Sequence, residues 1–299
     1  MLMKNAINYY YGLESQDIHQ SQKNYFFSTQ NEKYILYECN LSIEEVNKIY
    51  ELSTLLSYYK IPYHQILMNK QNKIFTSINN INYVLMKIKC DVNEINSFSI
   101  LNNNTLNLKN TNNIKYNNWY NLWTKKIDFL EYQFLEHKGY LKENKCLFNY
   151  YIGMTETAIM LSKKIKDGTK SICHKRINYK DTTLELYNPL NIIIDYKVRD
   201  ACEYFKNKFI YDELSIQEVI NYINTLNIDD IYIFFTRLLF PSYFFDIYEN
   251  IIEKKENEKK CEKIINKVEE YEYFLKIIYS YVKNITNIEE IEWLTKNVG

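Results

Sequence analysis

The first ninety residues combine short strand-like runs with one amphipathic segment. Ser42 and Glu45 have the spacing of a capping box, which predicts that a helix begins there. Apolar residues then recur at helical spacing as far as Pro62: Val46, Ile49, Leu52, Leu55 and Leu56. Strands are predicted on both sides of this helix: Lys23–Ser28, Lys33–Cys39 (after a turn at 29–32), Gln65–Met68, Lys73–Ser77 and Tyr83–Lys89. The pattern therefore predicts a small α+β unit.

Beyond Trp119 the apolar positions follow helical spacing over most of the chain. Ser215 and Glu218 form a second capping-box pattern. Strand-like residues return at 183–187 and 190–195. Helices are predicted over the remaining patterned ranges: 119–139, 150–166, 215–225, 229–240, 243–255 and from 268 to the end.

Two polar segments interrupt this second part of the chain. The asparagine-rich stretch of about 102–118 predicts an exposed loop or insertion. The dense charges of Glu253–Lys263 predict a solvated helix face or a linker. A small mixed N-lobe over residues 1–92 with an antiparallel sheet, followed by a mostly helical C-lobe over residues 93–299, is the outline of an α+β, bilobal kinase-like fold.

Composition and charge exclude several function classes. Formal net charge is zero, so a nucleic-acid partner is not expected. The most apolar run, Ile231–Tyr248, contains Arg237, Pro241 and Asp246, and no membrane span is expected. The N-terminus lacks the order of a signal peptide, which favours an intracellular chain. The motifs Gly-x-Ser-x-Gly, His-Glu-x-x-His and Gly-x-Gly-x-x-Gly do not occur.

Cysteine and tyrosine usage adds two expectations. The six cysteines are widely spaced without a Cys-x-x-Cys pair, so reduced core thiols are expected rather than a zinc site. The 30 tyrosines admit two interpretations. They reflect a drift of the whole chain toward Asn, Ile, Lys and Tyr, or exposed tyrosines serve interaction or oxidative cross-linking in an assembly.

The segment from Cys173 to Tyr204 has the order of a kinase catalytic region. Kinases place a catalytic Asp two residues after a His, an Asn five residues further on, and a metal-binding Asp at the end of a later strand. Here His174 is present, the base position holds Arg176, and the Asn position holds Asp181. Asp195 ends the strand-like run. The sequence thus predicts a degenerate catalytic loop.

Stretches across nearly the whole chain carry a family resemblance. Asn8–Leu13 resembles the opening of bacterial aminoglycoside-phosphotransferase-like proteins. Five further stretches resemble, in the same order, the spore coat-associated proteins of the CotS/YutH kind: Trp123–Asp128, Tyr151–Ile159, His174–Arg176, Asp195–Asp200 and Arg237–Pro241. The resemblance implies a kinase-like fold and a role in building the endospore coat.

Each position of the degenerate loop has a chemical and a structural interpretation. Arg176 stays protonated, so it cannot accept a substrate proton; it could hold an anion, and an ion pair with Asp181, Asp195 or Asp200 is favoured. Asp181 and Asp195 resemble Mg²⁺ ligands, or else Asp195 caps a turn and Asp181 lies in a solvated loop. We expect structural roles for His174 and for Asp200, whose carboxylate can bind N–H groups of the helix start or of the His174 loop.

Other parts of a phosphotransfer site are missing from the sequence. Neither Ser28–Lys33 nor Ile18–Asn24 contains the glycines that let a backbone approach phosphates closely. The strand position of the phosphate-binding Lys falls on or near Tyr37, and Lys33 lies at the strand's start. The usual glutamate partner of that Lys has three candidates: Glu44, Glu45 and Glu51.

The missing parts, taken with what the family resemblance implies, predict a pseudokinase-like structural or recruiting component of the bacterial endospore coat and favour a role other than catalysis. It would be made in the mother-cell cytoplasm, then join the coat with other spore coat proteins, and no cofactor is expected. One alternative is an active atypical small-molecule or protein kinase that uses ATP and Mg²⁺. Another is a nucleotide- or metabolite-binding regulator without phosphate transfer.

Overall fold

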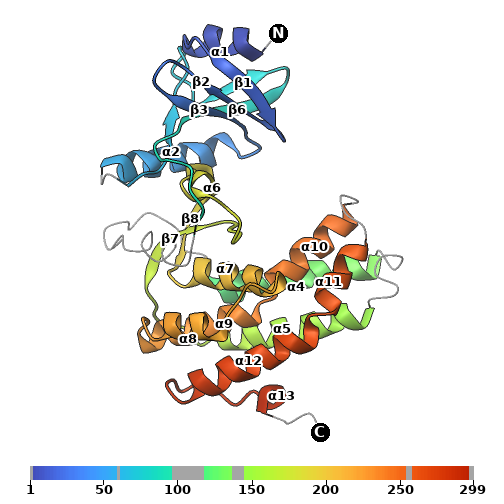
Figure 1. Ribbon diagram of the computed structural model, residues 1–299. Helices are drawn as coiled ribbons and strands as arrows, with labels where there is room; N and C mark the ends of the chain where they lie inside the picture. Colours follow the sequence, from blue (N-terminus) through green and yellow to red (C-terminus); the bar gives the residue numbers. More distant parts are fainter. Residues whose placement is uncertain (1–2, 59–60, 96–117, 137–144, 254–257, 296–299) are drawn as a thin grey trace. The chain divides into compact units, whose positions relative to one another are not determined.

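The computed structural model describes residues 3–58, 61–95, 118–136, 145–253 and 258–295 (Figure 1). The chain groups into two compact units. The first contains residues 1–95 together with 180–192, and the second contains 96–179 and 193–299. Residues 180–192, which the sequence analysis placed in the C-lobe, therefore pack with the first unit. Most of the asparagine-rich stretch lies outside the described residues.

The first unit is built on an antiparallel sheet with the strand order β1-β2-β3-β6-β4, and β5 pairs with β6. Its strands are β1 (Gln16–Ser21), β2 (Asn24–Ser28), β3 (Lys33–Glu38), β4 (Gln65–Leu67), β5 (Phe75–Ile78) and β6 (Ile81–Lys87). The strands predicted from the sequence are confirmed, with small shifts of their ends. β1 was missed because its residues, Gln-Asp-Ile-His-Gln-Ser, are polar and mostly exposed.

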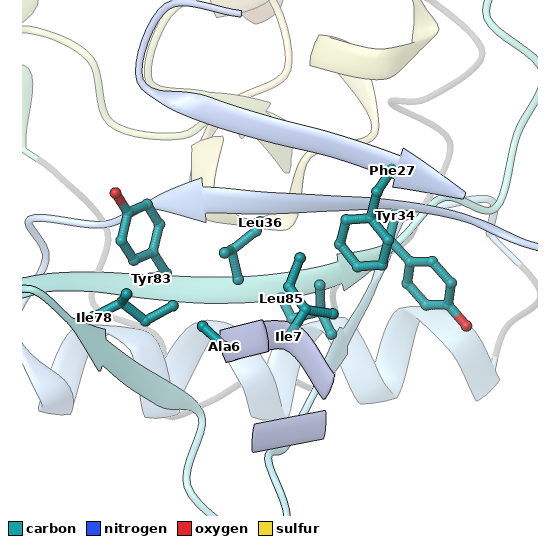
Figure 2. Packing of buried hydrophobic residues seen from close by; sticks show 8 residues of the cluster. All are labelled: Ala6, Ile7, Phe27, Tyr34, Leu36, Ile78, Tyr83 and Leu85. Carbon is teal, nitrogen blue, oxygen red and sulfur yellow. The ribbon is translucent and has the colours of Figure 1, made fainter. Parts of the chain in front are cut away.

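The two faces of this sheet bury alternate residues of the central strands, as the two-residue repeat of a strand requires. In β3, Tyr34 and Leu36 face one side, where helix α1 (Met3–Tyr11) covers them with Ala6 and Ile7 (Figure 2). Tyr83 and Leu85 of β6 lie in the same cluster: Ala6, Ile7, Phe27, Tyr34, Leu36, Ile78, Tyr83 and Leu85. The sequence analysis did not predict α1.

The end of α1 requires a glycine. Gly12 has φ +72°, a left-handed conformation, and its N–H donates to the carbonyl of Asn8 at 2.8 Å, as at many helix C-termini. A Cβ at this position would lie 2.8 Å from Cε of Lys70. The N–H of Lys70 in turn donates to the carbonyl of Tyr10 at 2.8 Å, which ties the helix end to the β4–β5 connection.

Helix α2 (Ile43–Tyr58) packs on the opposite face of the sheet. Val46 and Ile49 of α2 share a buried cluster with Val84 and Met86 of β6. The predicted capping box is confirmed, because the N–H of Glu45 donates to Oγ of Ser42 at 3.2 Å and the N–H of Ser42 donates to the Glu45 carboxylate at 2.9 Å. The backbone N–H groups of Ser42 and Glu45 thus find their acceptors within the same four residues at the start of α2.

The segment 180–192 corrects one prediction from the sequence. Residues 183–187 were expected to form a strand, but α6 (Thr183–Leu186) is a short helix. Thr182 caps it and Glu185 completes a capping box, a signal that outweighs the strand propensity of the β-branched threonines. A 3₁₀ turn, Pro189–Asn191, then leads into β8 (Ile192–Tyr196), which confirms the second predicted strand.

The second unit is mostly helical and also holds a two-stranded sheet of β7 (Lys170–His174) and β8. β7 was not predicted. The described helices of eight or more residues in the second unit are α4 (Trp119–Glu136), α5 (Lys145–Ser162), α7 (Arg199–Ile210), α8 (Ile216–Ile223), α9 (Ile228–Leu239), α10 (Ser242–Ile252) and α12 (Val268–Lys283). Shorter helical segments are the 3₁₀ turn η2 (Glu258–Cys261), α11 (Glu262–Ile265) and α13 (Glu292–Thr295).

Three expectations for this unit are corrected or limited. The side chain of Ser215 makes no capping hydrogen bond to α8, and Glu218 instead accepts from Lys208 of α7 at 2.6 Å. The helix predicted from 268 to the end is interrupted, because α12 ends at Lys283 and the short α13 begins only at Glu292. Four of the six cysteines are buried as expected, but Cys146 is exposed and Cys90 is partly exposed rather than in a core. Within the described ranges, no helix is both long and apolar enough to cross a lipid bilayer.

The contrast between the two predicted capping boxes can be tested by unfolding. Ser42→Ala should lower the free energy of unfolding by about 1 kcal/mol, because it removes the hydrogen bond to the N–H of Glu45. Ser215→Ala is the matched control and should change it by less than about 0.5 kcal/mol. Urea unfolding followed by circular dichroism measures both. Equal effects of the two substitutions would contradict the capping described here.

Candidate functional site

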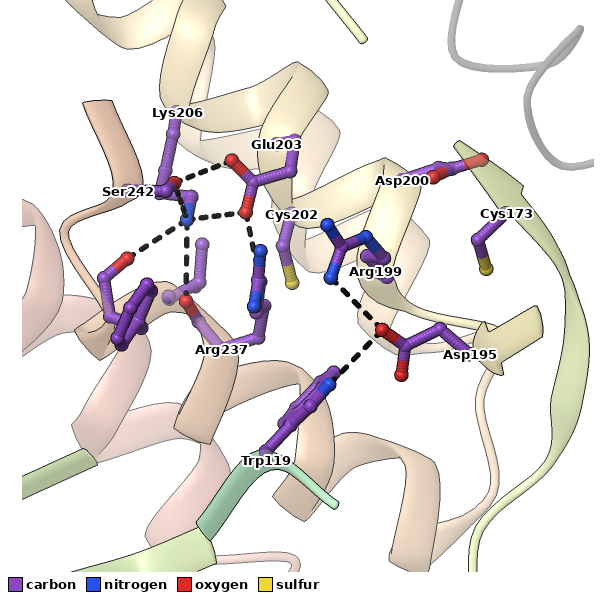
Figure 3. A network of polar contacts seen from close by, with 12 residues as sticks. Trp119, Cys173, Asp195, Arg199, Asp200, Cys202, Glu203, Lys206, Arg237 and Ser242 are labelled. Atoms are coloured by element: carbon purple, nitrogen blue, oxygen red, sulfur yellow. Dashed lines mark hydrogen bonds and ion pairs between the residues drawn. The ribbon is translucent and has the colours of Figure 1, made fainter. Parts of the chain in front are cut away.

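The second unit carries a buried ionic network at the start of α7. β8 ends at Tyr196, the residue after Asp195, and α7 begins at Arg199. Arg199, Glu203 and Lys206 follow each other at spacings of four and three residues, which places them along one face of the helix. That face is turned into the protein, where Arg199 and Lys206 are 7% and 1% exposed (Figure 3).

Asp195 is fully buried and its carboxylate is held by three donors. The indole Nε1 of Trp119 donates to Oδ2 at 3.2 Å, and Nη1 of Arg199 donates to the same oxygen at 2.9 Å (Figure 3). The backbone N–H of Tyr196 donates to Oδ1 at 2.7 Å. Arg199 is a well-suited partner, because its planar guanidinium has further donors for neighbouring groups.

Those further donors bind the degenerate catalytic loop. Nε of Arg199 donates to the carbonyl of His174 at 3.1 Å, and Nη2 donates to the carbonyl of Lys175 at 3.3 Å. Burial works to lower the pKa of Arg199, but the Asp195 carboxylate and other nearby acidic groups raise it above its ordinary value. One charged side chain thus ties β8, α7 and the loop together.

Asp200 binds the same loop from the first turn of α7. Its Oδ1 accepts from the backbone N–H of His174 at 2.9 Å, and its Oδ2 lies 2.6 Å from Nδ1 of the His174 ring. Both side chains are 1% exposed. These are the N–H contacts that the sequence analysis considered for Asp200, and they hold His174 in a structural position.

A second cluster continues along the same helix face. Nζ of Lys206 donates to Oε1 of Glu203 at 2.7 Å, to Oγ of Ser242 at 2.8 Å and to the carbonyl of Phe240 at 2.9 Å. Oγ of Ser242 donates to Oε2 of Glu203 at 2.5 Å, and Nε of Arg237 donates to Oε1 at 2.8 Å. A buried charge is costly unless it is paired in this way.

The pKa shifts follow from burial and pairing. Burial lowers the pKa of Lys206 to about 8, against the opposing effect of Glu203. Burial by itself would raise the pKa of Glu203, but the nearby Lys206, Arg237 and Arg199 hold it well below its ordinary value. Glu203 is therefore a carboxylate throughout the neutral range.

Three aromatic rings lie around the Arg237 guanidinium. The Arg237 guanidinium carbon lies 5.3 Å, 5.5 Å and 5.3 Å from the ring centroids of Trp119, Trp123 and Phe240. Trp119 stacks on Trp123 at 4.9 Å, and Trp123 stacks on Phe240 at 4.3 Å. The negative faces of aromatic rings favour a cation at such distances.

Formal charge is balanced over this network. Three carboxylates and three cations alternate in it: Asp195, Asp200, Glu203, Arg199, Lys206 and Arg237. The ion pairs at Glu203 join α7 to α9, and Ser242 adds the first turn of α10. This arrangement can stabilise the packing of the unit without binding anything from solution.

The structure places Arg176 in a pair that was not anticipated. Its Nη2 donates to Oδ1 of Asp246 at 2.7 Å, whereas the sequence analysis considered Asp181, Asp195 or Asp200. The side chains are 68% and 37% exposed, so the pair lies near the surface. Burial raises the pKa of Asp246, and the Arg176 guanidinium opposes this increase. Asp246 lies on α10, 70 residues away in sequence, which no local pattern reveals.

The two predicted magnesium ligands lie in different units. Asp181 belongs to the first unit, where its carbonyl accepts from the N–H of Ile95 at 3.4 Å. Asp195 belongs to the second unit and is bound by Arg199. Among the residues that the structure describes, no group of three or more His, Cys, Asp or Glu side chains is placed to hold a metal ion. The magnesium assignment stays a prediction.

The positions for gripping phosphates have local structural roles. Lys33, at the first position of β3, is exposed, and Tyr37 packs at the edge of the cluster between the sheet and α2. Two of the three glutamates proposed as partners of a strand lysine are used within α2. Glu44 pairs with Lys48 at 2.7 Å, and Glu45 belongs to the capping box.

Sequence reasoning missed the residues that extend the network beyond Asp195 and Asp200. Trp119, Glu203, Lys206 and Ser242 were not singled out, and Arg237 was noted only as an interruption of an apolar run and within a family stretch. Local sequence gives no signal for them: the charged residues at positions 199, 200, 203 and 206 share one face of α7 and the apolar residues at 201, 202, 204 and 205 share the other, which is typical of a helix with one face in solvent. Such a helix is buried only if its charges are paired.

The Asp195–Arg199 pair should contribute far more to stability than the Arg176–Asp246 pair. Arg199→Gln should lower the free energy of unfolding by about 3–5 kcal/mol, because it leaves a buried carboxylate without its counter-charge. Arg176→Gln is the matched control and should cost less than about 1 kcal/mol, since its pair is exposed. Urea unfolding measures both. Similar losses would contradict the difference in burial.

Glu203 should make stability sensitive to acid. Its folded pKa lies below the ordinary 4.5, so its contribution is present above about pH 4.5 and is lost as the pH falls toward the folded pKa. The difference in unfolding free energy between the natural chain and Glu203→Gln should therefore narrow between pH 5 and pH 3, on the order of 1 kcal/mol. Urea unfolding across this range measures it, and a constant difference would exclude this role.

The fold is similar to that of several solved phosphotransferases. An aminoglycoside phosphotransferase from Alicyclobacillus acidocaldarius has a TM-score of 0.66 at 9% identity, over 95% of this chain and 97% of that one. A spectinomycin phosphotransferase in complex with ADP and spectinomycin has a TM-score of 0.57 at 11% identity, over 93% and 97%. A choline kinase from Streptococcus pneumoniae has a TM-score of 0.50 at 12% identity, over 94% and 98%. These identities show the fold alone, which is the expected α+β, bilobal kinase-like fold.

Sequence comparison identifies the family. An endospore coat-associated protein, YutH, from Bacillus subtilis (strain 168) is 26% identical over 209 residues, which cover 60% of this chain. The match spans about three fifths (61%) of that relative. A family model described as "Spore coat putative kinase YutH" matches residues 4–278, nearly the whole chain. The chain therefore belongs to the YutH family of spore coat proteins.

Proposed function

We propose that this protein is a structural or recruiting component of the endospore coat that keeps the kinase-like fold without transferring phosphate. In this proposal it is made in the cytoplasm of the mother cell and then joins the coat through contacts with other coat proteins. The family and its endospore coat-associated relative support the coat context. The chemistry of the degenerate loop supports the absence of transfer.

The observation that carries the proposal is the pairing of Asp195. This carboxylate has the place in the sequence of the magnesium ligand of kinases, yet it is fully buried and bound by Arg199 and Trp119. A divalent cation on Oδ2 would lie against the guanidinium, and two like charges at such distances repel strongly in a buried site. In our proposal Arg199 supplies within the chain the positive charge that a metal ion supplies in an active kinase.

The base position supports the same conclusion. Arg176 cannot accept a proton at any relevant pH, and its guanidinium pairs with Asp246. His174, two residues earlier, is engaged with Asp200 through both its backbone N–H and its ring. The base position and the His174 that precedes it are therefore not available to accept a proton from a substrate hydroxyl.

The rival is an active atypical kinase that uses ATP and Mg²⁺ on a small molecule or a protein. Its support is the word kinase in the family description and the similarity to solved phosphotransferases. A regulator that binds a nucleotide or metabolite without transfer is the third possibility. The active kinase would bind nucleotide and transfer phosphate, the regulator would bind its ligand without transfer, and the structural component would do neither.

The proposal makes a prediction about divalent cations. ATP with Mg²⁺ should hardly change the free energy of unfolding of the natural chain. A ligand that binds the folded state and is present at 100 times its Kd would instead raise that free energy by about 2.7 kcal/mol. Arg199→Gln should respond to Mg²⁺ or Mn²⁺ with a concentration-dependent rise in melting temperature, because the freed Asp195 carboxylate then needs a cation. Thermal unfolding with and without EDTA measures both effects.

Two controls make this experiment decisive. The double variant Asp195→Asn, Arg199→Gln lacks the carboxylate and should not respond to divalent cations, and Arg176→Gln should behave as the natural chain. Transfer of labelled phosphate from ATP by the natural chain, lost in Asp195→Asn, would overturn the proposal in favour of the active kinase. Strong stabilisation of the natural chain by nucleotide without transfer would favour the regulator.

A further inference from the structure

One long face of α4 carries large apolar side chains that are exposed. Phe129 and Tyr132 are 50% and 62% exposed. No other described helix has as many exposed large apolar residues as the four on this face: Leu122, Phe129, Tyr132 and Leu135. A large apolar patch on a protein surface is commonly a place where another molecule binds. The ionic network does not use this face.

The opposite face of α4 fixes the orientation of the helix. Phe134 stacks on Phe148 of α5 with ring centroids 4.1 Å apart, and Lys126 pairs with Glu249 of α10. Four further side chains on this inner face are buried: Trp119, Trp123, Ile127 and Leu130. The helix therefore cannot turn its exposed apolar residues inward without losing this packing.

Five exposed residues of α4 recur at alternating spacings of three and four positions, and we call them the α4 stripe: Leu122, Lys125, Phe129, Tyr132 and Glu136. This is the spacing of the a and d positions through which two helices pack along each other. Within the described part of the chain, none of these five side chains has a hydrogen bond, an ion pair or a ring contact. The stripe thus has the pattern of a helix-packing surface whose partner lies outside the chain.

The two charges of the α4 stripe lie on opposite sides of its aromatic residues. Lys125 lies toward the start of α4, Glu136 is its last residue, and Phe129 and Tyr132 lie between them. If a second α4 runs antiparallel, Phe129 of each copy faces Tyr132 of the other, and Lys125 of each copy faces Glu136 of the other. A parallel pair would instead bring each of these charges against its own copy. The charges and the helix dipoles therefore both favour an antiparallel second copy.

We propose that the α4 stripe binds the α4 stripe of a second copy of this chain in an antiparallel, two-fold symmetric homodimer. In such an interface every contact occurs twice. Two contacts between Phe129 and Tyr132 form its centre, and two ion pairs between Lys125 and Glu136 lie on either side. The aromatic pairs supply most of the attraction, and the ion pairs set the orientation. This inference does not depend on whether the protein transfers phosphate.

Sedimentation velocity of the full chain at several concentrations tests whether the dimer forms. A contact through one helix from each copy is small for a protein interface, so we expect a Kd on the order of micromolar. Between about 1 and 100 µM the 36.3 kDa monomer should therefore convert to a species of twice that mass. A chain that stays monomeric over this range would overturn the proposal.

Charge reversal tests the pairing of Lys125 with Glu136. Lys125→Glu should weaken dimerisation about tenfold, because it brings two carboxylates together, and Glu136→Lys should do the same with two ammonium groups. The double variant Lys125→Glu, Glu136→Lys restores opposite charges and should return to within about threefold of the natural Kd. Failure of the double variant to recover would overturn the antiparallel arrangement, since a parallel pair keeps like charges together in all three variants.

Removal of an aromatic ring tests the centre of the interface. Phe129→Ser should weaken dimerisation by at least about tenfold, because it removes a ring from both contacts. Tyr273→Ser on α12 is the matched control, since Tyr273 is also exposed, at 66%, but lies on another helix, and it should change the Kd less than about twofold. Circular dichroism checks that each variant is folded. A dimer that Phe129→Ser leaves intact would overturn the proposal, because another surface would then form the interface.

Discussion

A carboxylate that is completely buried must have a counter-charge, and in this protein that constraint acts on Asp195. Arg199 meets it at 2.9 Å, and the same guanidinium also binds the carbonyls of His174 and Lys175. The strand, the helix and the loop that would carry catalysis in a kinase are therefore joined by one side chain. Removing that side chain would disturb all three elements, since each depends on it for a buried polar contact.

The residues of the family motifs converge on this network. Asp195–Asp200 and Arg237–Pro241 are separated by almost forty residues, yet both meet at Trp119, whose indole donates to Asp195 and whose ring centroid lies 5.3 Å from the Arg237 guanidinium carbon. The motif residues Asp195 and Asp200 thus bind side chains and backbone groups of the chain itself. Such contacts can stabilise a fold shared with phosphotransferases whatever its chemistry, because a fold does not by itself fix a function.

The sequence predicted the first unit well where local signals were strong. Runs of aromatic and aliphatic residues marked β3 and β6, which are buried over consecutive positions, and the Ser42–Glu45 pattern marked the start of α2. Predictions were wrong where two local signals competed, as at 183–187, where a capping box outweighed β-branched residues. The pattern at Ser215 and Glu218 was misread for another reason. Lys208, brought close by folding, takes the glutamate that would complete the box.

By itself the sequence determined the fold class, the family resemblance and the presence of Arg176 two residues after His174, because these depend on residue types and their order. Only the tertiary structure decided what the side chains at these positions bind. The partner of Arg176 is 70 residues away, and the donors to Asp195 include an indole 76 residues earlier in the chain. Such pairings are set by how helices and strands pack, since a charge is satisfied by whatever donor the fold brings within hydrogen-bond distance, and no local pattern encodes that proximity.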